Sequence, residues 1–405
     1  MANAASRAPG SAIEVFWAAL RLGLTSFGGP VAHLGYYREE YVRRRRWLDD
    51  AAYGDLVALC QSLPGPTSSQ VGIAIGTLRA GWPGGLLSFI GFTAPSAIAM
   101  IAFAYGVTAF DVRNAGWLHG LVVAAVAVVA NAVWGMSLTL ATGRTRASIA
   151  ILAAAVMLLA PSPLTQVLVI AAGAVGGAAF LAGEDAPTAE VSVDDRVSRL
   201  HGRRAGAFAL ALFLVLLAVL PVAAHTFGTQ ALALIDANYR AGSLVLGGGH
   251  LVLPLLRESV VPPGWVTDER FIAGYGAAQA VPGPLFTFAA YLGAVEGPRP
   301  NGWAGGLIAL GAIYVPTFLM VWGMLPFWDR LRTHGSVQAG LRGASAAVVG
   351  ILLAALYTPV WTSAIHAPAD FALAVVCFGL LTAWKLPPWL VVVVAALGGQ
   401  ALALV

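Results

Sequence analysis

Long stretches of this chain contain no Asp, Glu, Lys or Arg, and they recur along its whole length. A helix needs about 20 apolar residues, at about 1.5 Å per residue, to cross a hydrocarbon core of about 30 Å. Most of the stretches reach that length, so the pattern predicts a series of membrane-spanning helices. The uncharged stretches are 80–110, 114–143, 147–183, 205–235, 271–295, 300–328, 343–369 and 386–405.

Composition strengthens this prediction. Of the 405 residues, 59% are hydrophobic and 10% are charged, and the mean hydropathy is +0.79. Soluble domains average about 25% charged residues, and their single cores stop growing near about 250–300 residues. A soluble protein is therefore excluded, and we expect an all-α polytopic membrane protein.

The chain also matches itself. The segment Gln61–Pro66, with its Pro-Gly-Pro, reappears as Gln279–Pro284 at an offset of 218 residues. An ordered series of such matches indicates an internal duplication, a common feature of transporters. The other matches are Trp47 with Trp265, Glu40 with Glu258, Trp82 with Trp303, Pro95 with Pro316 and, loosely, Gly28–His33 with Gly247–His250.

The duplication divides the chain into an N-terminal repeat (1–182), a polar loop with one linking helix (183–227) and a C-terminal repeat (228–405). Each repeat should begin with a glycine-interrupted segment, continue with a helix broken at Pro-Gly-Pro and end in four spans. The expected segments are 12–43, 51–80, 84–110, 116–142, 147–161 and 163–182, then 229–259, 268–296, 303–328, 334–361, 368–384 and 386–405.

The two pieces of each broken helix contain 12–14 residues, or roughly 20 Å of helix, which is too short to cross the core. Each broken segment is thus either a re-entrant hairpin or one kinked crossing. With hairpins, about nine full spans result and the second repeat enters from the opposite side; up to about 13 spans result if every broken segment crosses.

Basic residues test this inverted topology. The hairpin arrangement places most of them on one side, which the positive-inside rule makes cytoplasmic, together with the interdomain loop. That side receives Arg43–Arg46, Arg79, Arg144, Arg146, Arg196, Arg199, Arg203, Arg204, Arg330, Arg332 and Lys385, and the other receives Arg113, Arg257, Arg270 and Arg299.

The Pro-Gly-Pro breaks carry the candidate chemistry. Proline ends a helix and frees carbonyls, while the next helix begins with unpaired N–H groups that favour anions. In the first repeat that helix opens on Thr67, Ser68 and Ser69, but the second opens on Leu285-Phe286-Thr287, so one asymmetric anion site is predicted. The proposed binding residues are Gln61, Gly65, Thr67, Ser68, Ser69, Gln279, Gly283 and Thr287, with Gly28, Gly29, Gly248 and Gly249 of the glycine-rich breaks.

The simpler alternative is a tight turn between two spans, with Ser and Thr as helix caps. This alternative is less favoured because the breaks occupy corresponding positions in both repeats, a pattern that is typical of a transporter binding site.

Several ionisable residues near the breaks are candidates for ion coupling or charge balance, since charges at membrane depth are costly and usually functional. Each also has a simpler interpretation: an interfacial ion pair for the glutamates, polar packing for the histidines, membrane anchoring for the arginines, and a position at the interface for Asp55. The candidates are His33, Arg38, Glu40, Asp55, Arg79, His250 and Glu258.

These residues fall in strings that resemble the chromate ion transporter (CHR) family in its long, two-domain form. The strings are Ser26–Tyr36, Arg44–Leu48, Leu59–Pro66, Gln70–Gly81, Gly91–Ser96, Leu246–His250 and Gly274–Phe288. The resemblance implies export of chromate across the bacterial inner membrane and hence chromate resistance, while some members are linked to sulfate.

From the residues and the resemblance we expect secondary active transport by alternating access, coupled to protons. No Walker loop is visible, and we expect no metal, cofactor or nucleic-acid partner; a homodimer stays open. The alternatives are an uncoupled anion channel and a membrane-embedded enzyme, the latter lacking paired carboxylates or a His/Cys cluster at ligand spacing.

Overall fold

The computed structural model of the chain describes residues 10–27, 29–109, 116–181, 202–245, 252–327 and 335–404. Within these ranges every regular element is a helix. Five helices are long and apolar enough to cross a membrane, and four shorter apolar helices accompany them. The predicted all-α polytopic membrane fold is confirmed, and the number of complete crossings stays a prediction.

The helices of the first repeat follow the expected order. A π-helical turn, Arg38–Arg44, continues α2. The helices are α1 (Ala12–Thr25), α2 (Gly29–Tyr37), α3 (Asp50–Ser62), α4 (Thr67–Ala109), α5 (Gly116–Leu140), α6 (Gly143–Leu159) and α7 (Pro163–Phe180).

The second repeat has the same order and follows the linking helix α9 (Arg203–Phe227). A 3₁₀ turn, Leu285–Thr287, stands at the start of its second half-helix. The helices are α10 (Gln230–Leu244), α11 (Val252–Val260), α12 (Asp268–Ala280), α13 (Phe288–Val295), α14 (Gly302–Met324), α16 (Gly335–Ala355), α17 (Thr362–Ala364), α18 (Pro368–Thr382) and α19 (Pro388–Leu402).

Proline chemistry explains where the broken helices stop. The residue before a proline is pushed out of the helical region by the proline ring. Leu63, before Pro64, is extended at φ −95° and ψ 148° and ends α3. Val281, before Pro282, is extended at φ −93° and ψ 138° and ends α12. Both breaks therefore fall where the sequence predicts them.

The first repeat has a second interruption, inside α4. Ala80 and Gly81 leave helical geometry, and Gly81 has a φ of 65° that glycine adopts without strain. A half-helix beginning at Thr67 is thereby separated from the long span that follows. In the second repeat the corresponding place is the loop between α13 and α14.

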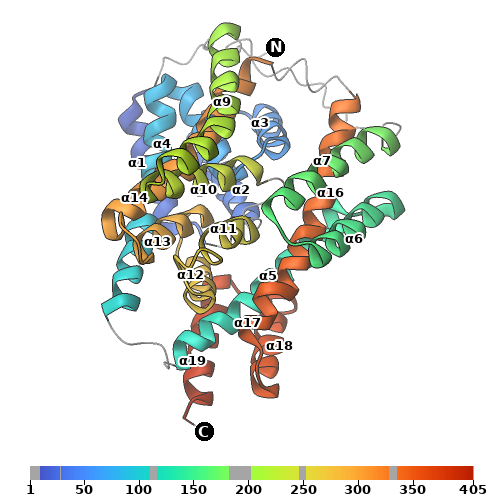
Figure 1. Cartoon of the computed structure of the whole chain (residues 1–405). Helices are drawn as coiled ribbons and strands as arrows, with labels where there is room; N and C mark the ends of the chain where they lie inside the picture. The colour runs from blue at the N-terminus through green and yellow to red at the C-terminus, as the bar shows by residue number, and fades with distance from the viewer. Residues whose placement is uncertain are drawn as a thin grey trace.

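Two groups of helices make up the molecule (Figure 1). In the first, which we call the broken-helix bundle, α1 packs on α4, and α10 and α13 pack on α14. In the second, the swapped-helix bundle, the partners come from opposite repeats. Helix α5 packs on α18 and α19, whereas α16 packs on α6 and α7. The swapped-helix bundle is therefore built by helices of both repeats packed against each other.

Glycine allows these swapped helices to touch through their backbones. A Cβ on Gly120 of α5 would overlap the carbonyl of Ala395 in α19. A Cβ on Gly343 of α16 would likewise overlap the carbonyl of Gly173 in α7. Small residues at helix contacts favour association inside a membrane because they permit close van der Waals packing.

Gly343→Ala should therefore destabilise the fold by about 1–3 kcal/mol through overpacking. Gly311→Ala is the control: Gly311 lies in α14, where an added Cβ would have nothing within 4 Å, so this change should be neutral or stabilising by up to about 1 kcal/mol. Thermal unfolding of the purified variants in detergent measures both changes. A Gly343→Ala protein as stable as Gly311→Ala would contradict this packing.

Candidate anion site at the crossed Pro-Gly-Pro breaks

The two Pro-Gly-Pro breaks are tied together by a pair of crossed hydrogen bonds. The Gly65 amide donates to the Val245 carbonyl at 2.6 Å, and the Gly283 amide donates to the Ser26 carbonyl at 2.9 Å. Ser26 and Val245 are the residues that end α1 and α10. Each break thus binds the end of the first helix in the opposite repeat.

The backbone at these glycines has a handedness that other residues rarely adopt. Gly65 has φ +122° and Gly283 has φ +102°, both in the region that favours glycine. A Cβ at Gly65 would also lie 2.8 Å from Nε2 of Gln70. Glycine at both breaks is therefore a requirement of the geometry.

The predicted hydroxyl cluster lies beside the first break. Ser68 and Ser69 are each 3% exposed, and Thr67 is buried with them. Ser68 Oγ lies 3.3 Å from Nδ1 of His33, whose Nε2 lies 3.2 Å from the Ser26 carbonyl. Ser69 Oγ lies 3.3 Å from the Tyr314 hydroxyl in α14 of the other repeat. The cluster therefore draws on both repeats.

Several buried polar atoms of the broken-helix bundle have no hydrogen-bond partner among the described residues. Thr317 Oγ1 would lie 3.4 Å from a Cβ at Gly65, which places it at the first break. Unpaired polar groups are costly in a dry interior, so these atoms are available to a polar ligand. They are Ser26 Oγ, Tyr37 Oη, Gln70 Oε1, Gln279 Nε2 and Thr317 Oγ1.

The glutamines before the two breaks differ in their surroundings. Gln61 is exposed at the end of α3, whereas Gln279 is partly buried. The carbonyl freed at Pro64 accepts a 2.7 Å hydrogen bond from Nε2 of Gln70, a residue outside the predicted site. In the second repeat, Thr287 Oγ1 donates to the Pro284 carbonyl at 2.9 Å. That hydroxyl is thus engaged by its own break, in keeping with an asymmetric site.

The glycine-rich breaks are described only in part. Gly29 begins α2 with φ +77°. Gly28, Gly248, Gly249 and His250 lie outside the described residues, as does the side chain of Asp55 in α3.

The other charged candidates form ion pairs away from the breaks. Arg38 Nε donates to Asp50 at 2.7 Å, and Arg79 Nη2 lies 3.3 Å from Glu14. Glu40 accepts from Arg45 at 2.7 Å, and Glu258 lies 3.7 Å from Arg257. These contacts agree with the ion-pair alternative for the glutamates. The donors that the structure gathers at the breaks are neutral.

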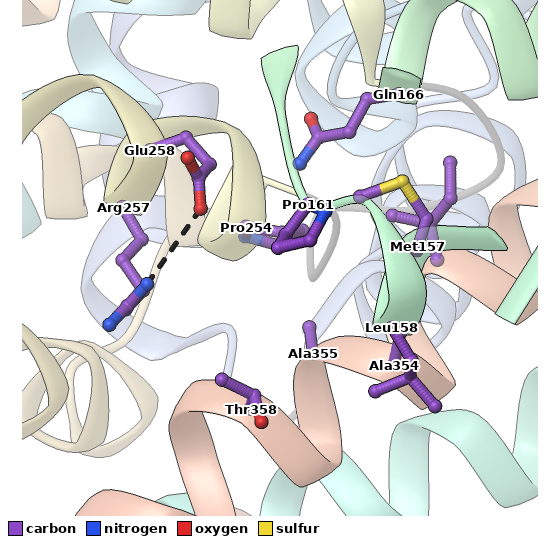
Figure 2. A pocket seen from close by; sticks show the side chains of 11 residues that line it. Met157, Leu158, Pro161, Gln166, Pro254, Arg257, Glu258, Ala354, Ala355 and Thr358 are labelled. Carbon is purple, nitrogen blue, oxygen red and sulfur yellow. Dashed lines mark ion pairs between the residues drawn. The ribbon is translucent and has the colours of Figure 1, made fainter. Parts of the chain in front are cut away.

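A separate small cavity of about 130 Å³ involves Glu258 (Figure 2). It lies between α6–α7 of one repeat and α11 and α16 of the other. Gln166, which is 1% exposed, reaches toward it, and the Arg257–Glu258 pair lines another side. The cavity is distinct from the crossed breaks, and its further lining residues are Met157, Leu158, Pro161, Pro254, Ile351, Ala354, Ala355 and Thr358.

Sequence reasoning missed Gln70, Thr317, Tyr314 and Tyr37 as site residues. Gln70 follows the Thr-Ser-Ser run directly, and Thr317 stands in the Pro316 match to Pro95–Ser96, so both carried a usable signal. Tyr314 carried none, because its approach to Ser69 depends on how α14 crosses α4.

Paired broken helices, a buried cluster of neutral donors between two repeats and several apolar spans define a membrane transport protein. Among the described residues no group of three His, Cys, Asp or Glu side chains could hold a metal ion. Residues 13–178 and 232–400 match the family described as chromate transporter. The chain belongs to that family of transport proteins, and the match extends over both halves of the chain.

Curated relatives extend along nearly the whole chain. It is 29% identical over 402 residues to the chromate transport protein of Pseudomonas aeruginosa, covering 96% of this chain and 92% of the relative. It is 25% identical to the chromate transport protein of Cupriavidus metallidurans, covering 94% and 90%. A probable chromate transport protein of Synechococcus elongatus is 24% identical, at 94% and 93% coverage. No solved structure matches the chain.

Gly65→Ala should impair the site because alanine is strained at this φ and its Cβ displaces Gln70. We expect substrate binding or flux to fall by about tenfold or more, given about 1–3 kcal/mol of backbone strain. Gly54→Ala, at an exposed position of α3 where an added Cβ would have nothing within 4 Å, is the matched control. Equal flux by both variants, at equal amounts in the membrane, would show that the break geometry is unimportant.

Proposed function

We propose that this protein moves chromate across the bacterial inner membrane by secondary active transport, in the direction of efflux, and so confers chromate resistance. Sulfate is the alternative substrate, since the two are similar tetrahedral dianions. The family and the names of the curated relatives support chromate. The single observation that supports the mechanism is the crossing of two broken helices at one buried cluster of donors.

The anion would be held by neutral donors at the start of α4. Its first N–H groups lack partners within the helix, and a helix N-terminus carries roughly half a positive charge. The hydroxyls of Thr67, Ser68 and Ser69 add donors from the same turn. Neutral donors bind a dianion without fixing it by a full opposite charge, which favours release on the other side.

Alternating access would follow from an inverted relation between the repeats. Three observations support inversion: the 25-residue helix α9, which joins the repeats and is the one linking helix among the described residues, the equivalent crossed hydrogen bonds and the bias of basic residues to one side. Each crossed bond joins a break in one repeat to a helix end in the other. Rocking of one repeat against the other would therefore open the site first to one face and then to the opposite one.

The double variant Ser68→Ala and Ser69→Ala tests the site. Each lost hydrogen bond to a charged ligand costs about 1.5–3 kcal/mol, so flux at low substrate should fall at least about tenfold. The control is Ser137→Ala with Thr139→Ala, two exposed hydroxyls of α5 that bond to their own helix. Chromate and sulfate flux would be measured in proteoliposomes with the pH gradient and voltage set independently.

Three outcomes of that measurement would contradict the proposal. Unchanged flux in the Ser68/Ser69 variant would show that these hydroxyls do not bind the anion. Flux that follows voltage and ignores the pH gradient would indicate an uncoupled channel. Absence of both chromate and sulfate flux in the unaltered protein would remove the substrate assignment.

A further inference from the structure

A carboxyl group is buried at the end of the second half-helix of the C-terminal repeat, with no counterion among the described residues. Glu296 follows α13 directly and is 3% exposed. Neither of its carboxylate oxygens has a hydrogen-bond partner among those residues, and their ion pairs do not include it. Burying a charged carboxylate without a counterion costs roughly several kcal/mol. This environment therefore favours the neutral, protonated acid.

The carboxyl group of Glu296 lies beside an amide, Gln230, at the first turn of α10, while Asn301 Nδ2 donates to the Glu296 backbone carbonyl at 3.4 Å. Its Nε2 atom is also buried, with no partner in the described part of the chain. A neutral acid and a primary amide are complementary, because the acid O–H donates to the amide oxygen while the amide N–H donates to the acid carbonyl. A carboxylate could use only half of this arrangement.

Within the described ranges, no arginine, lysine or histidine forms an ion pair with Glu296. Arg257 is engaged by Asp268 at 2.8 Å, and Arg240 by Asp236 at 2.7 Å. Hydroxyls nearby are also engaged, since Tyr291 donates to the Arg270 carbonyl and the Tyr105 hydroxyl accepts from the Trp303 amide. The titratable and charged groups on the elements around Glu296 are Arg79 and Tyr105 of α4, Asp236, Tyr239 and Arg240 of α10, Asp268, Glu269, Arg270 and Tyr275 of α12, Tyr291 of α13, Arg299 of the loop and Tyr314 of α14.

We use the word joint for the place where the end of a repeat's second half-helix meets the start of that repeat's first helix, as Glu296 after α13 meets Gln230 of α10. The corresponding joint of the first repeat is built differently. There the end of the second half-helix carries Arg79, which lies 3.3 Å from Glu14 at the start of α1. Arg45 approaches the same Glu14 at 3.5 Å. At the offset of 218 residues between the repeats, Arg79 corresponds to Gly297, the neighbour of Glu296. Glu14 corresponds to Leu232, two residues from Gln230. One joint is therefore closed by an ion pair, whereas its counterpart places a buried acid beside a buried amide.

We propose that Glu296 is a proton-binding site that couples transport to protons: it is protonated while the α10–α13 joint is closed and releases its proton when the joint opens to water. This inference rests on the proposed transport function and gives its coupling ion a place. It differs from Glu40 and Glu258, the glutamates suggested by the sequence, because those two are paired with Arg45 and Arg257.

The pH dependence follows from the environment of this acid. Burial raises the pKa of Glu296 from its usual 4.5 to about 8, and the interaction with Gln230 opposes that rise only in part. A raised pKa means that the closed joint binds a proton that the open joint releases. Protonation of Glu296 therefore stabilises the closed joint fully below pH 4.5, and this stabilisation is lost as the pH rises through about 8.

The test combines infrared difference spectroscopy with flux, using Glu296→Gln, which mimics the neutral acid in size and hydrogen bonding. The unaltered protein should show a protonated-carboxyl band that disappears as the pH is raised through about 8, and Glu296→Gln should lack it. Flux driven by a pH gradient should fall at least about tenfold in Glu296→Gln, while exchange of anion for anion at equal pH continues. Glu269→Gln, an exposed acid of α12, is the matched control and should keep both the band and the driven flux.

The spectroscopic arm needs no substrate, so it separates this inference from the proposed function. No titrating band in the unaltered protein, or a band that persists in Glu296→Gln, would overturn the inference even if chromate flux is normal. Normal gradient-driven flux in Glu296→Gln would overturn the coupling role. A band that Glu296→Gln removes, in a protein that moves neither chromate nor sulfate, would support the proton site and remove only the substrate.

Discussion

The need to satisfy backbone groups where helices break inside a membrane governs this architecture. Prolines 64 and 66 and their counterparts free carbonyl and amide groups that lipid cannot bond. The amides of Gly65 and Gly283 are satisfied across the repeat boundary, by the carbonyls of Val245 and Ser26. The freed Pro64 and Pro284 carbonyls accept hydrogen bonds within their own repeats, from Gln70 and Thr287. Because each break depends on the other repeat, both must be held in place by the helices around them.

This constraint also explains why polar side chains collect at the breaks. A helix that starts in the interior brings its unpaired N–H groups there, and Ser and Thr at its first turn extend the polar surface. Gln70 then returns to the Pro64 carbonyl from one turn further on. The helix break thus itself supplies the polar groups of the proposed binding site. The break in the second repeat supplies fewer hydroxyls.

Local features of the structure follow from sequence, whereas contacts between distant helices do not. Uncharged runs located the long apolar helices, and proline placed the ends of α3 and α12. The Thr67–Ser69 turn was predicted as a site lining, and the structure buries it. Tyr314 and Glu296 escaped notice because their significance depends on which helices pack around them. A glutamate ending an apolar helix looks like an interfacial charge until its burial is known.

The exchange of helices between repeats has a consequence for how the chain is made. During synthesis α5 enters the membrane long before α19, its packing partner, exists. The glycine faces of α5 and α7 must remain in lipid, or against provisional neighbours, until translation is almost complete. The last fifteen-residue helix, Pro388–Leu402, therefore finishes the first repeat as much as the second. A premature stop near the C-terminus would damage the N-terminal repeat, although every residue of that repeat had been made.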